Sequence, residues 1–577
     1  MSKSYSVKPT VSSDLVEQLL HNRGIVDVEA KKKFLNPDFD THLHDPLLMS
    51  DMAKAVDRIL FAIEKDEKIA VWSDYDADGI PGAALMHDFF KLIGYNNFIN
   101  YIPDRHDEGY GLNIEGMERL KEEKINLVIT VDCGIRDLKE IARANELGME
   151  VIVTDHHEPG EELPSAFAIV NPKLKDSKYP EAVLCGSGVA WKLIQKIMER
   201  WKDGNLPTGK AGIKNGQEKW LLDVVGLATL SDMVPLTGEN RVIAHYGLKV
   251  LRKTRRPGLQ KLYSLLRMNG ATLTEDDVAF MITPRINAAS RMGKPRDAFE
   301  LLIETDYGKA DALARHLDGI NNERKGVVAG IVKEAKKHIA TRFENHGERP
   351  VIVMGNPLWR PSLLGLAANS IAEEYNRPVF LWGRDNGNGI KGSCRSDGVT
   401  DLVAIMERAN GHLLEFGGHK MSGGFSVGED MIHTLEQALV DAFELGLDKL
   451  SPNTAINSSI SIPTVFADSE LKIKDVKGNV ADEISKLAPF GMGNDKPLFL
   501  FHNVIAERIN KFGKGKEHLE VQLRDGSHTA RAIGFFCTPD SFGDKLQEGR
   551  VCNLAANLEK SFFGGRTETR LRIVDFF

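Results

Sequence analysis

The fold of this chain is decided by the stretch IAVWSDYDADG, residues 69–79. Its first four residues form an apolar run typical of a buried strand, and two similar runs occupy residues 127–131 and 151–154. Between the runs, residues 83–93 and 138–147 have the apolar spacing of amphipathic helices. Strands that alternate with helices in this way predict an α/β fold built on a doubly wound parallel sheet.

Acidic residues and histidines follow each of the three predicted strands. They are Asp74, Asp76 and Asp78 after the first strand, Asp132 after the second, and Asp155, His156 and His157 after the third. An open α/β sheet binds its ligands beyond the carboxyl ends of its strands. We therefore expect these side chains to meet at one rim of the sheet.

The alternating aspartates also match the start of an EF-hand calcium loop, but the rest of such a loop is missing. An EF-hand needs a bidentate Glu at the twelfth loop position, where this chain has Leu85, and Pro81 lies inside the loop. One Asp after a strand is more simply a helix cap, whereas three in one turn repel one another unless cations neutralise them. Carboxylates with imidazoles suit Mn²⁺, with Mg²⁺ tolerated, and two such ions catalyse phosphate-ester hydrolysis.

The rest of the chain is predicted to form a connecting helix and two further domains. Apolar residues at helical spacing from 313 to 339 indicate a long helix, and the runs at 351–354 and 378–382 indicate a second, smaller α/β domain. Residues 451–454 suit a linker, and short alternating runs beyond them predict a C-terminal β-barrel of the oligonucleotide-binding (OB) type. The expected boundaries are 1–50 for an N-terminal helical segment, 51–305 for the doubly wound domain, 306–345 for the connecting helix, 346–450 for the second domain and 455–577 for the barrel.

The composition is that of a globular protein. The 577 residues are 42% hydrophobic and 27% charged, which argues against long disordered stretches. With 74 Lys plus Arg against 82 Asp plus Glu, the net charge is −8, so the chain cannot bind nucleic acid by bulk positive charge. Five scattered cysteines without a CxxC pair indicate neither a zinc site nor a disulfide framework, and a reducing cytoplasm fits them best. Neither a secretory leader nor a membrane span is expected.

Basic residues are nevertheless concentrated in two places. Residues 241–270 contain eight of them and no acidic residue. This run is either a solvated face or a basic surface along which a nucleic-acid backbone binds, here called a rail. The predicted barrel adds basic residues interleaved with aromatic ones, and these aromatic rings either stack on bases or fill the barrel core. They are Lys511, Lys514, Lys516, Arg566, Arg570 and Arg572, with Phe512, Phe562 and Phe563.

Several motifs, in their order along the chain, make it similar to a known family. DYDADG at residues 74–79, VDCG at 131–134, DHH at 155–157 and SDMVPL at 231–236 resemble the motifs of the DHH phosphoesterase superfamily. Three more are similar to its branch of exonucleases specific for single-stranded DNA: TPRINAASRMG at 283–293, GGHKMSGGF at 417–425 and LAPFGMGN at 487–494. The match runs from about residue 50 to the C-terminus.

This resemblance implies roles for individual residues. The ligands of two metal ions, Mn²⁺ or Mg²⁺, would be Asp74, Asp76, Asp78, Asp132, His156 and Asp232. Asp132 would bridge the ions, and Asp74 is the least typical ligand, because other branches have a histidine where this chain has Trp72. The implied catalytic residues are Asp132, His157 acting on the reacting phosphate, and Asp155 orienting an imidazole. The implied substrate-binding residues are Arg285, Asn287, Ser393, Arg395 and His419.

Several positions depart from the pattern of the family; the exchanges at Ser290, Ser422 and Gly423 are between small residues, whereas two others are larger changes. Cys394 stands where the family commonly has glycine, and Arg360 stands where it commonly has histidine. Both lie in the part of the second domain that is implied to hold the 5′ end of the strand. They leave open how this chain grips that end.

The function implied by the resemblance is a single-stranded-DNA-specific 5′-to-3′ exonuclease that releases 5′-mononucleotides by two-metal hydrolysis, in DNA repair and recombination. Two alternatives stay open: a DHH phosphodiesterase acting on short oligonucleotides, and an inactive DNA-binding subunit of a replication complex. Single-stranded DNA is the implied partner, with a helicase and a single-strand-binding protein as candidates. We expect a cytoplasmic monomer without membrane contact.

Overall fold

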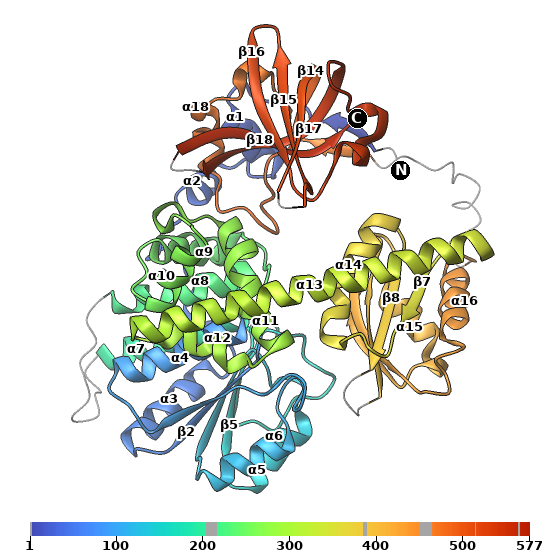
Figure 1. Ribbon diagram of the computed structural model, residues 1–577. Helices are drawn as coiled ribbons and strands as arrows, with labels where there is room; N and C mark the ends of the chain where they lie inside the picture. Colours follow the sequence, from blue (N-terminus) through green and yellow to red (C-terminus); the bar gives the residue numbers. More distant parts are fainter. Residues whose placement is uncertain (1–2, 203–215, 385–388, 449–463, 514, 564–565) are drawn as a thin grey trace.

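The chain forms three bodies, and one long helix joins the first two of them, as the computed structural model shows (Figure 1). It describes residues 3–202, 216–384, 389–448, 464–513, 515–563 and 566–577. The predicted linker at 451–454 lies outside these residues. Within these ranges no helix is both long and apolar enough to cross a membrane.

The first body is built on a five-stranded sheet in the order β3-β2-β4-β5-β6, in which every pairing is parallel. Counted from its first strand this order is 2-1-3-4-5, a doubly wound arrangement whose ligand crevice lies between the first and third strands. The crevice therefore opens at the carboxyl ends of β2 and β4. The strands are β2 (Ile69–Ser73), β3 (Phe98–Tyr101), β4 (Leu127–Val131), β5 (Glu150–Thr154) and β6 (Ala168–Val170).

Helices cover both faces of this sheet. Successive residues of a strand point to opposite faces, so Val71 joins one hydrophobic core and Trp72 joins the other. The first core includes α3 (Met52–Glu64), α4 (Gly79–Leu92) and α7 (Gly186–Lys202), and the second includes α5 (Ile114–Glu122) and α6 (Leu138–Glu146). Every residue of β2 and β4 is buried, as expected for central parallel strands.

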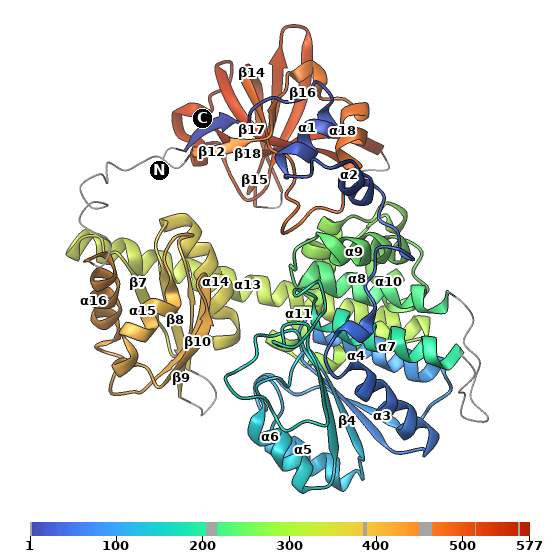
Figure 2. The same cartoon turned by 180° about the vertical axis from the view of Figure 1, so that it is seen from behind.

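A helical layer extends the first core away from the sheet. It consists of α8 (Leu222–Ser231), α9 (Gly238–Leu251), α10 (Pro257–Leu265), α11 (Thr283–Met292) and α12 (Pro295–Ile303). The 40-residue helix α13 (Tyr307–His346) packs on α10 and α11 and then continues to α14 (Pro361–Tyr375) in the second domain (Figures 1 and 2). The predicted connecting helix is therefore present and is longer than the apolar pattern indicated.

The second domain has a mixed five-stranded sheet in the order β10-β11-β9-β8-β7. Only β7 and β8 are parallel, and the remaining pairings are antiparallel. The strands are β7 (Ile352–Gly355), β8 (Val379–Arg384), β9 (Ile390–Arg395), β10 (Glu415–His419) and β11 (Ser422–Val427), and α15 (Leu402–Arg408) and α16 (Leu435–Asp448) complete the domain.

The third body is a closed barrel in which each strand pairs with two others. Its strands run in the order β14-β15-β16-β18-β17, and β17 pairs back with β14. They are β14 (Phe499–Phe512), β15 (His518–Asp525), β16 (His528–Gly534), β17 (Val551–Phe563) and β18 (Arg566–Phe576), with the short β13 (Ser469–Glu470) and α18 (Gly478–Ser485) beside them. The predicted fold class, with its doubly wound domain, long helix, second α/β domain and barrel, is confirmed.

The N-terminal segment belongs to the barrel in space. It contains α1 (Leu15–Asn22) and α2 (Val28–Leu35), as the helical expectation requires, but it starts with a strand, β1 (Ser4–Val7). This strand pairs in parallel with β12 (Thr464–Ala467), and side chains of α1 enter the barrel core. Contacts between residues this far apart in sequence leave no local pattern, so the segment looked independent of the barrel.

Candidate metal centre

A cavity of about 300 Å³ opens where β2, β4 and β5 end, at the crevice of the doubly wound sheet. Five of the six expected metal ligands line it, namely Asp74, Asp76, Asp132, His156 and Asp232. The sixth, Asp78, is buried beside them with its Oδ2 3.8 Å from Nε2 of His156. The structure thus brings all six residues to one rim.

The turn after β2 points its aspartates in different directions. Oδ1 of Asp76 accepts hydrogen bonds from the backbone N–H groups of Asp78 (2.8 Å) and Gly79 (3.1 Å), which closes the turn at the start of α4. Glycine is needed at position 79, because a Cβ there would lie 2.3 Å from the carbonyl oxygen of Asp74. The carboxylate of Asp78 accepts hydrogen bonds from the first two backbone N–H groups of α7, so it also fixes that helix to the turn.

Asp132 occupies a strained position directly after β4. Its φ of 63° lies in the left-handed region, which few residues other than glycine adopt. Gly186 packs so closely that a Cβ on it would lie 2.5 Å from the Cβ of Asp132. Oδ1 of Asp132 lies 3.1 Å from Nε2 of His156, but this contact is not aligned as a hydrogen bond, and no other described residue gives the oxygen a partner. Strain and an unpartnered buried oxygen together indicate a functional position.

Ligand atoms converge in three overlapping groups, and within each group they all lie within 4.8 Å of one another. The groups are Asp74, Asp76 and Asp132; Asp78, His156 and Asp232; and Asp132, His156 and His157. Asp132 and His156 each belong to two groups, so they lie between neighbouring candidate ion positions. Mixed carboxylate and imidazole donors suit Mn²⁺ and are tolerated by Mg²⁺.

The carboxylates of this cavity cannot all be charged without a counterion. Burial raises the pKa values of Asp74, Asp78 and Asp132, and neighbouring aspartates raise them further. The same causes raise the pKa of Asp232 to about 9. Oδ1 of Asp74 is also buried, without a hydrogen bond from the residues that the structure describes. Divalent cations relieve both the repulsion and the unpartnered oxygens, so these residues fit a metal centre.

The stability that Mn²⁺ adds to the protein is expected to grow as the pH rises. A carboxyl whose pKa is higher in the folded state, such as Asp232 at about 9 against 3.8, binds more protons folded than unfolded between these values. The metal-free protein therefore loses stability as the pH rises through this window, whereas the metal-bound one needs the charged carboxylates. Melting temperatures in EDTA and in Mn²⁺ from about pH 5 to about pH 8 measure the difference. A metal-induced gain that shrinks over this range would contradict the prediction.

His157 is held by Asp155. Oδ1 of Asp155 lies 2.8 Å from Nδ1 of His157 and accepts hydrogen bonds from the backbone N–H groups of His156 and His157. Burial opposes charge on both side chains, but their hydrogen bond outweighs it, so the pKa of His157 is raised and that of Asp155 is lowered. The Tyr110 hydroxyl lies 3.2 Å from the same Nδ1. His157 thus takes up a proton more readily than a free histidine. Burial instead lowers the pKa of His156, so its imidazole stays neutral more readily, as a metal ligand must be.

Two arginines that the motif comparison did not assign, Arg105 and Arg291, line the same cavity. Arg105 lies over the ring of Tyr75, 5.1 Å from its centroid. Arg291 lies on α11 one turn after Asn287, and Oδ1 of Asn287 accepts a hydrogen bond from the backbone N–H of Ala77 in the aspartate turn (3.0 Å). Asn287 therefore steadies the metal-ligand turn, and Arg291 supplies a cation beside it.

Arg285, which was expected to bind phosphate, does not line the cavity. Its Nε and one Nη contact Oδ1 of Asp318 on α13, at 3.0 and 2.7 Å, and its other Nη donates to the carbonyl of Met281. Residues four apart share a helix face and residues two apart do not, so Arg291 shares the face of Asn287 while Arg285 is turned toward α13. This spacing was the signal in the motif that could have identified Arg291.

Ser393, Arg395 and His419 lie on one face of the second domain's sheet. Ser393 and Arg395 are two residues apart on β9, and the register places Arg395 beside Ser422 and Ser422 beside His419. Arg395 packs on α14, where a Cβ on Gly365 would lie 2.6 Å from its guanidinium. These three residues do not line the metal-centre cavity and form a separate polar group across from it.

The two groups are nevertheless close enough to interact. Burial, followed by the charges of Arg105, Arg324 and Arg395, lowers the pKa of Arg291 to about 10. Arg291 also donates to the carbonyl of Ser362 on α14 (2.8 Å), and the Ser362 hydroxyl donates to the carbonyl of Arg291 (3.0 Å). Cations from both sides of the domain boundary therefore gather at Arg291, which suits a bound phosphate.

The two positions that depart from the family pattern are placed apart from each other. The Cys394 side chain is buried in the second-domain core, with Sγ 3.9 Å from Sδ of Met406, and thus lies on the opposite sheet face from Arg395. Arg360 directly precedes α14 and contacts Sδ of Met292 at the end of α11, at the boundary between the domains. Cys394 therefore does not contribute to the sheet face that carries Ser393 and Arg395.

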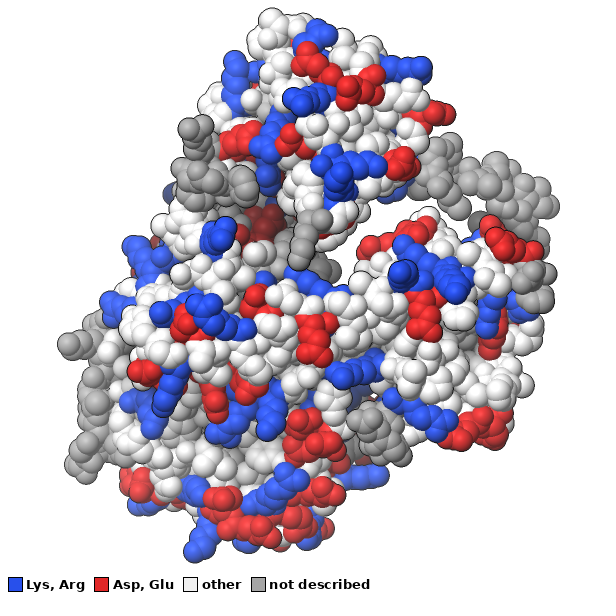
Figure 3. Space-filling view, in the orientation of Figure 1, with Lys and Arg blue, Asp and Glu red and all other residues white. Residues whose placement is uncertain are grey.

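Part of the basic run at 241–270 is structural, which weakens the rail interpretation. Arg241 is buried and donates to the carbonyls of Phe34, Ala488 and Pro489, and Arg256 is paired with Asp223 and Asp88. Arg255 lies over the ring of Trp220 and Lys249 over that of Tyr246. On the face shown in Figure 3, basic and acidic side chains are interspersed.

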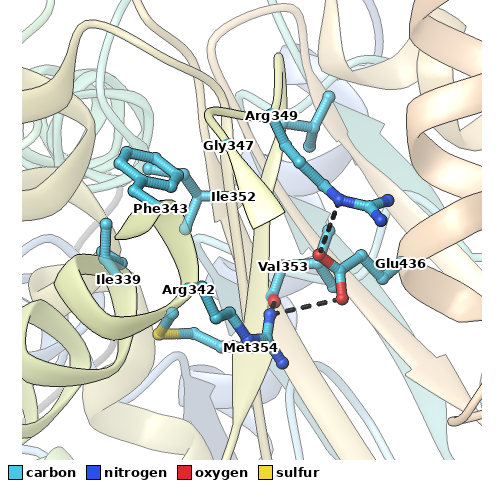
Figure 4. A pocket seen from close by; sticks show the side chains of 10 residues that line it. Ile339, Arg342, Phe343, Gly347, Arg349, Ile352, Val353, Met354 and Glu436 are labelled. Atoms are coloured by element: carbon cyan, nitrogen blue, oxygen red, sulfur yellow. Dashed lines mark hydrogen bonds and ion pairs between the residues drawn. The ribbon is translucent and has the colours of Figure 1, made fainter. Parts of the chain in front are cut away.

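A second cavity, of about 260 Å³, lies in the second domain between the end of α13, β7 and α16 (Figure 4). Arg342 and Arg349 point toward Glu436 from two sides, and Arg342 also donates to the carbonyl of Val353 (3.0 Å). Its charged groups therefore pair with one another, in contrast to the unpartnered oxygens of the metal-centre cavity.

The barrel carries a cluster of aromatic rings, here called the barrel aromatic cluster, made of Phe512, His518, Phe535 and Phe536. Phe536 is 84% exposed, and the guanidinium of Arg572 lies over the ring of Phe535 at 3.9 Å. The charge of Asp276 in the first body acts on Arg572, so the cluster lies near that body. The side chains of Phe562, Phe563 and Arg566 lie outside the described residues.

The motif at 487–494 lies in the barrel module, by which we mean the barrel and the residues before it from 464 on, and it contacts the loop beside the metal centre. The backbone N–H of Leu236 donates to the carbonyl of Met492 (2.7 Å), and a Cβ on Gly493 would lie 3.2 Å from the side chain of Pro235. Pro235 and Leu236 belong to the loop that starts with the ligand Asp232. The barrel module thus supports a metal-ligand loop directly.

Comparison with known proteins matches all three bodies. The model of the DHH family, N-terminal domain, matches residues 68–227; that of the DHHA1 domain matches residues 325–445; and that of the RecJ OB domain matches residues 467–575.

Relatives and solved structures agree with these matches. The single-stranded-DNA-specific exonuclease RecJ of Bacillus subtilis is 36% identical over 97% of this chain and 67% of its own length. The RecJ of Haemophilus influenzae is 31% identical over 92% of this chain and 91% of its own. The crystal structure of Thermus thermophilus RecJ in complex with Mn²⁺ has a TM-score of 0.77 and 26% identity, covering 100% of this chain and 79% of that one. The chain therefore belongs to the RecJ family of DHH proteins.

Proposed function

We propose that this chain is a single-stranded-DNA-specific exonuclease that removes 5′-mononucleotides from a 5′ end by two-metal hydrolysis, in DNA repair and recombination. The observation that carries the proposal is one cavity that joins metal-ligand groups to the guanidinium groups of Arg105 and Arg291. This combination suits a phosphodiester. Relatives named as single-stranded-DNA-specific exonucleases support the substrate, and the polarity rests on the family resemblance.

The metal ligands fall into two sets that meet at Asp132. Asp74, Asp76 and Asp132 would hold one ion, and Asp78, His156 and Asp232 would hold a second, with Asp132 between them. Bound Mn²⁺ or Mg²⁺ would lower the pKa of the attacking water and neutralise charge on the phosphate. The left-handed backbone of Asp132 fixes its carboxylate between the two sets before any metal binds.

The remaining residues of the cavity would act on the phosphate and the leaving group. Asp155 and Tyr110 orient the His157 imidazole, whose raised pKa allows it to donate a hydrogen bond or proton to developing negative charge. Arg105 and Arg291 would contact non-bridging phosphate oxygens, the role first expected of Arg285. Asn287 acts indirectly, by holding the turn that carries Asp76 and Asp78.

Arg291→Ala is expected to lower kcat/KM for a 5′-phosphorylated strand by about 10- to 100-fold, the value of one or two hydrogen bonds to a charged group. Arg291→Lys should keep part of the activity, because lysine keeps the positive charge but lacks the paired N–H donors of the guanidinium group. The matched control is Arg296→Ala, an exposed helix arginine paired with Glu300. Equal losses in the Arg291→Ala and Arg296→Ala variants would contradict the role.

The second domain would hold the 5′ end. Ser393, Arg395 and His419 share the sheet face next to α14, and Arg395 is electrostatically coupled to Arg291. A terminal phosphate placed there would leave the first phosphodiester at the metal centre. The paired glycines Gly417 and Gly418 leave this end of the sheet open to close backbone approach.

The barrel aromatic cluster would bind the strand on its way to the metal centre. Phe536 is expected to stack on a base, and Phe536→Ala should weaken binding of a long oligonucleotide by about 1–3 kcal/mol. Phe466→Ala is the matched control, because Phe466 is also an exposed ring, at 60%, but lies outside the barrel aromatic cluster. Fluorescence anisotropy with an uncleavable strand measures both affinities, and the same loss for both variants would remove the cluster from the strand path.

The polarity and the product are tested with strands labelled at one end. With Mn²⁺, a 5′-labelled strand should yield labelled mononucleotide at the earliest times, while a 3′-labelled strand shortens stepwise. Mononucleotide released first from the 3′ label would overturn the proposed polarity. A strong preference for dinucleotides over long strands would instead favour a phosphodiesterase of short oligonucleotides.

The cellular setting also belongs to the proposal. We place the chain in the cytoplasm as a monomer, with single-stranded DNA as substrate and with a helicase and a single-strand-binding protein as candidate partners. The proposed domain boundaries are 51–305, 306–345, 346–450 and 455–577, with residues 1–50 as a separate N-terminal segment. The contacts of β1 and α1 support a test in which the N-terminal segment and the barrel are expressed together.

A further inference from the structure

A groove between α13 and α14 lies next to the metal centre and has no role in the chemistry described above. Its volume is about 610 Å³, within the range of about 300–1,000 Å³ that is usual for small-molecule sites. Arg324, Lys325, Val328 and Val332 of α13 form one wall, and Leu366 lies on the wall formed by α14.

This groove starts one turn of α14 beyond the contact between Ser362 and Arg291, the arginine that lines the metal-centre cavity. Ser362, which exchanges hydrogen bonds with Arg291, shares a face of α14 with Leu366 and Ser370, one and two turns further on. At 1.5 Å per residue the groove therefore leads about 12 Å away from the Ser362 contact. On the α13 side, Arg324 is close enough to contribute to the lowered pKa of Arg291.

The groove is basic, and much of its charge is not neutralised by the protein. Lys325 and Lys333 are exposed and form no ion pair with a residue that the structure describes. Nε of Arg324 is buried without a hydrogen-bond partner in the described part of the chain. Lys336 is the exception, because it pairs with Glu374.

The walls of the groove are apolar between their cations, so its best ligand is an anion with a flat or apolar part. Val328, Val332 and Leu366 supply this apolar surface. A nucleoside 5′-monophosphate has this chemistry, because its phosphate carries the charge and its base has an apolar face. Inorganic phosphate would use the cations alone.

We propose that this groove binds the nucleoside 5′-monophosphate released at the metal centre and leads it away from the active site. The inference rests on the proposed function, in which the strand enters with its 5′ end first. The groove shares no lining residue with the metal-centre cavity and includes none of Ser393, Arg395 and His419, the residues proposed to hold the 5′ end. No part of such a strand extends beyond its own 5′ end, so we assign this separate groove to the product and not to the substrate. Product that lingers in the groove would slow the next turnover.

The proposal is tested by binding of thymidine 5′-monophosphate to the full-length protein in Mg²⁺, measured by equilibrium dialysis. The groove variant is Lys325→Glu with Lys333→Glu. The matched control is Lys309→Glu with Lys337→Glu, which makes the same charge change at exposed positions of α13 outside the groove. We expect the dissociation constant to rise at least about tenfold in the groove variant, as for loss of charged contacts, and to stay unchanged in the control.

Three results would overturn the proposal. They are unchanged nucleotide affinity in the groove variant, equal wild-type affinity for inorganic phosphate and for thymidine 5′-monophosphate, and a tenfold loss of affinity for a single strand in the groove variant. The last result would assign the groove to the substrate. The labelled-strand assay measures the exonuclease activity separately. If the protein is an active exonuclease but the groove variant binds the nucleotide as tightly as the wild type, only the product-site proposal is wrong and the proposed function stands.

Inhibition kinetics give an independent measurement. Added thymidine 5′-monophosphate should inhibit steady-state cleavage by the wild type and the control, and the groove variant should need about ten times more for the same inhibition. The first cleavage event in a single-turnover experiment should be the same in all three proteins. Inhibition that does not differ between them would contradict a product site in the groove.

Discussion

Asp132→Asn is expected to reduce strand cleavage by about 10³-fold or more and, at the same time, to raise the melting temperature of the metal-free protein. The side chain belongs to two ligand groups, so its loss weakens both candidate ion positions. Asparagine has the same size but carries no charge and offers one oxygen fewer. Activity therefore falls because the ligand set is broken and not because the fold is.

The stability change in the same variant has the opposite sign, for an electrostatic reason. Burial and the charges of Asp78, Asp76 and Asp74 raise the pKa of Asp132, so without metal the folded state must either hold a proton there or bear the repulsion. A neutral amide removes this cost. The increase should be larger at higher pH, where more of the carboxylates would be charged.

An exposed aspartate of the same body provides the control. Asp176→Asn should leave both the activity and the melting temperature unchanged, since Asp176 is exposed and lies outside the ligand groups. Activity of Asp132→Asn within tenfold of the wild type, or a lower melting temperature in EDTA, would contradict the assignment. The two measurements separate a metal ligand from a residue that only maintains the fold.

The sequence could predict that the candidate metal ligands lie together, for a topological reason. Parallel strands end at one edge of their sheet, so a motif after each strand specifies a common location without any knowledge of side-chain packing. Asp74, Asp132 and His156 come from three different strand ends and share one cavity. Asp232 follows a helix and could be placed only through the family motif.

Residues on the helices around this centre were harder to predict, because their direction depends on packing. The motif at 283–293 contains two arginines, and Arg285 was chosen although it is turned toward Asp318 of α13. Arg291 shares a helix face with Asn287 and lies in the cavity. Pairing with a residue that lies 33 positions further along the chain cannot be read from the motif itself.

Long-range pairing also limits what the basic run at 241–270 can indicate. A run of basic residues without nearby acidic residues in the sequence looks like a solvated or nucleic-acid-binding face, because its pairing partners come from distant parts of the chain. The acids that pair with Arg256 come from α4 and α8, and the carbonyls that bind Arg241 come from α2 and the motif at 487–494. Lys496 of the barrel module likewise pairs with Asp276 of the first body. Net charge and charge runs therefore say little about the substrate of a chain this long.

Arg256→Met should lower the free energy of unfolding of the first body by about 3–5 kcal/mol, the cost of removing one partner of a buried ion pair. Arg256 contacts both carboxylate oxygens of Asp223, at 2.7 and 3.0 Å, and also Asp88 at 2.6 Å, and it donates to the carbonyl of Leu302. Methionine fills a similar volume but leaves two carboxylates without their counterion. The rail interpretation predicts instead that stability is kept and strand affinity falls.

Lys253→Met, three residues earlier in the same run, decides between the two interpretations. Lys253 is exposed, so its replacement should change the free energy of unfolding by no more than about 0.5 kcal/mol. Urea unfolding followed by tryptophan fluorescence suits the comparison, because Trp72, Trp191 and Trp201 are all buried in this body. Strand affinity measured on the folded variants completes the test. If Arg256→Met and Lys253→Met both kept full stability and both lost affinity for single strands, the run would be a rail after all, and the buried pairs of Arg256 would have no structural role.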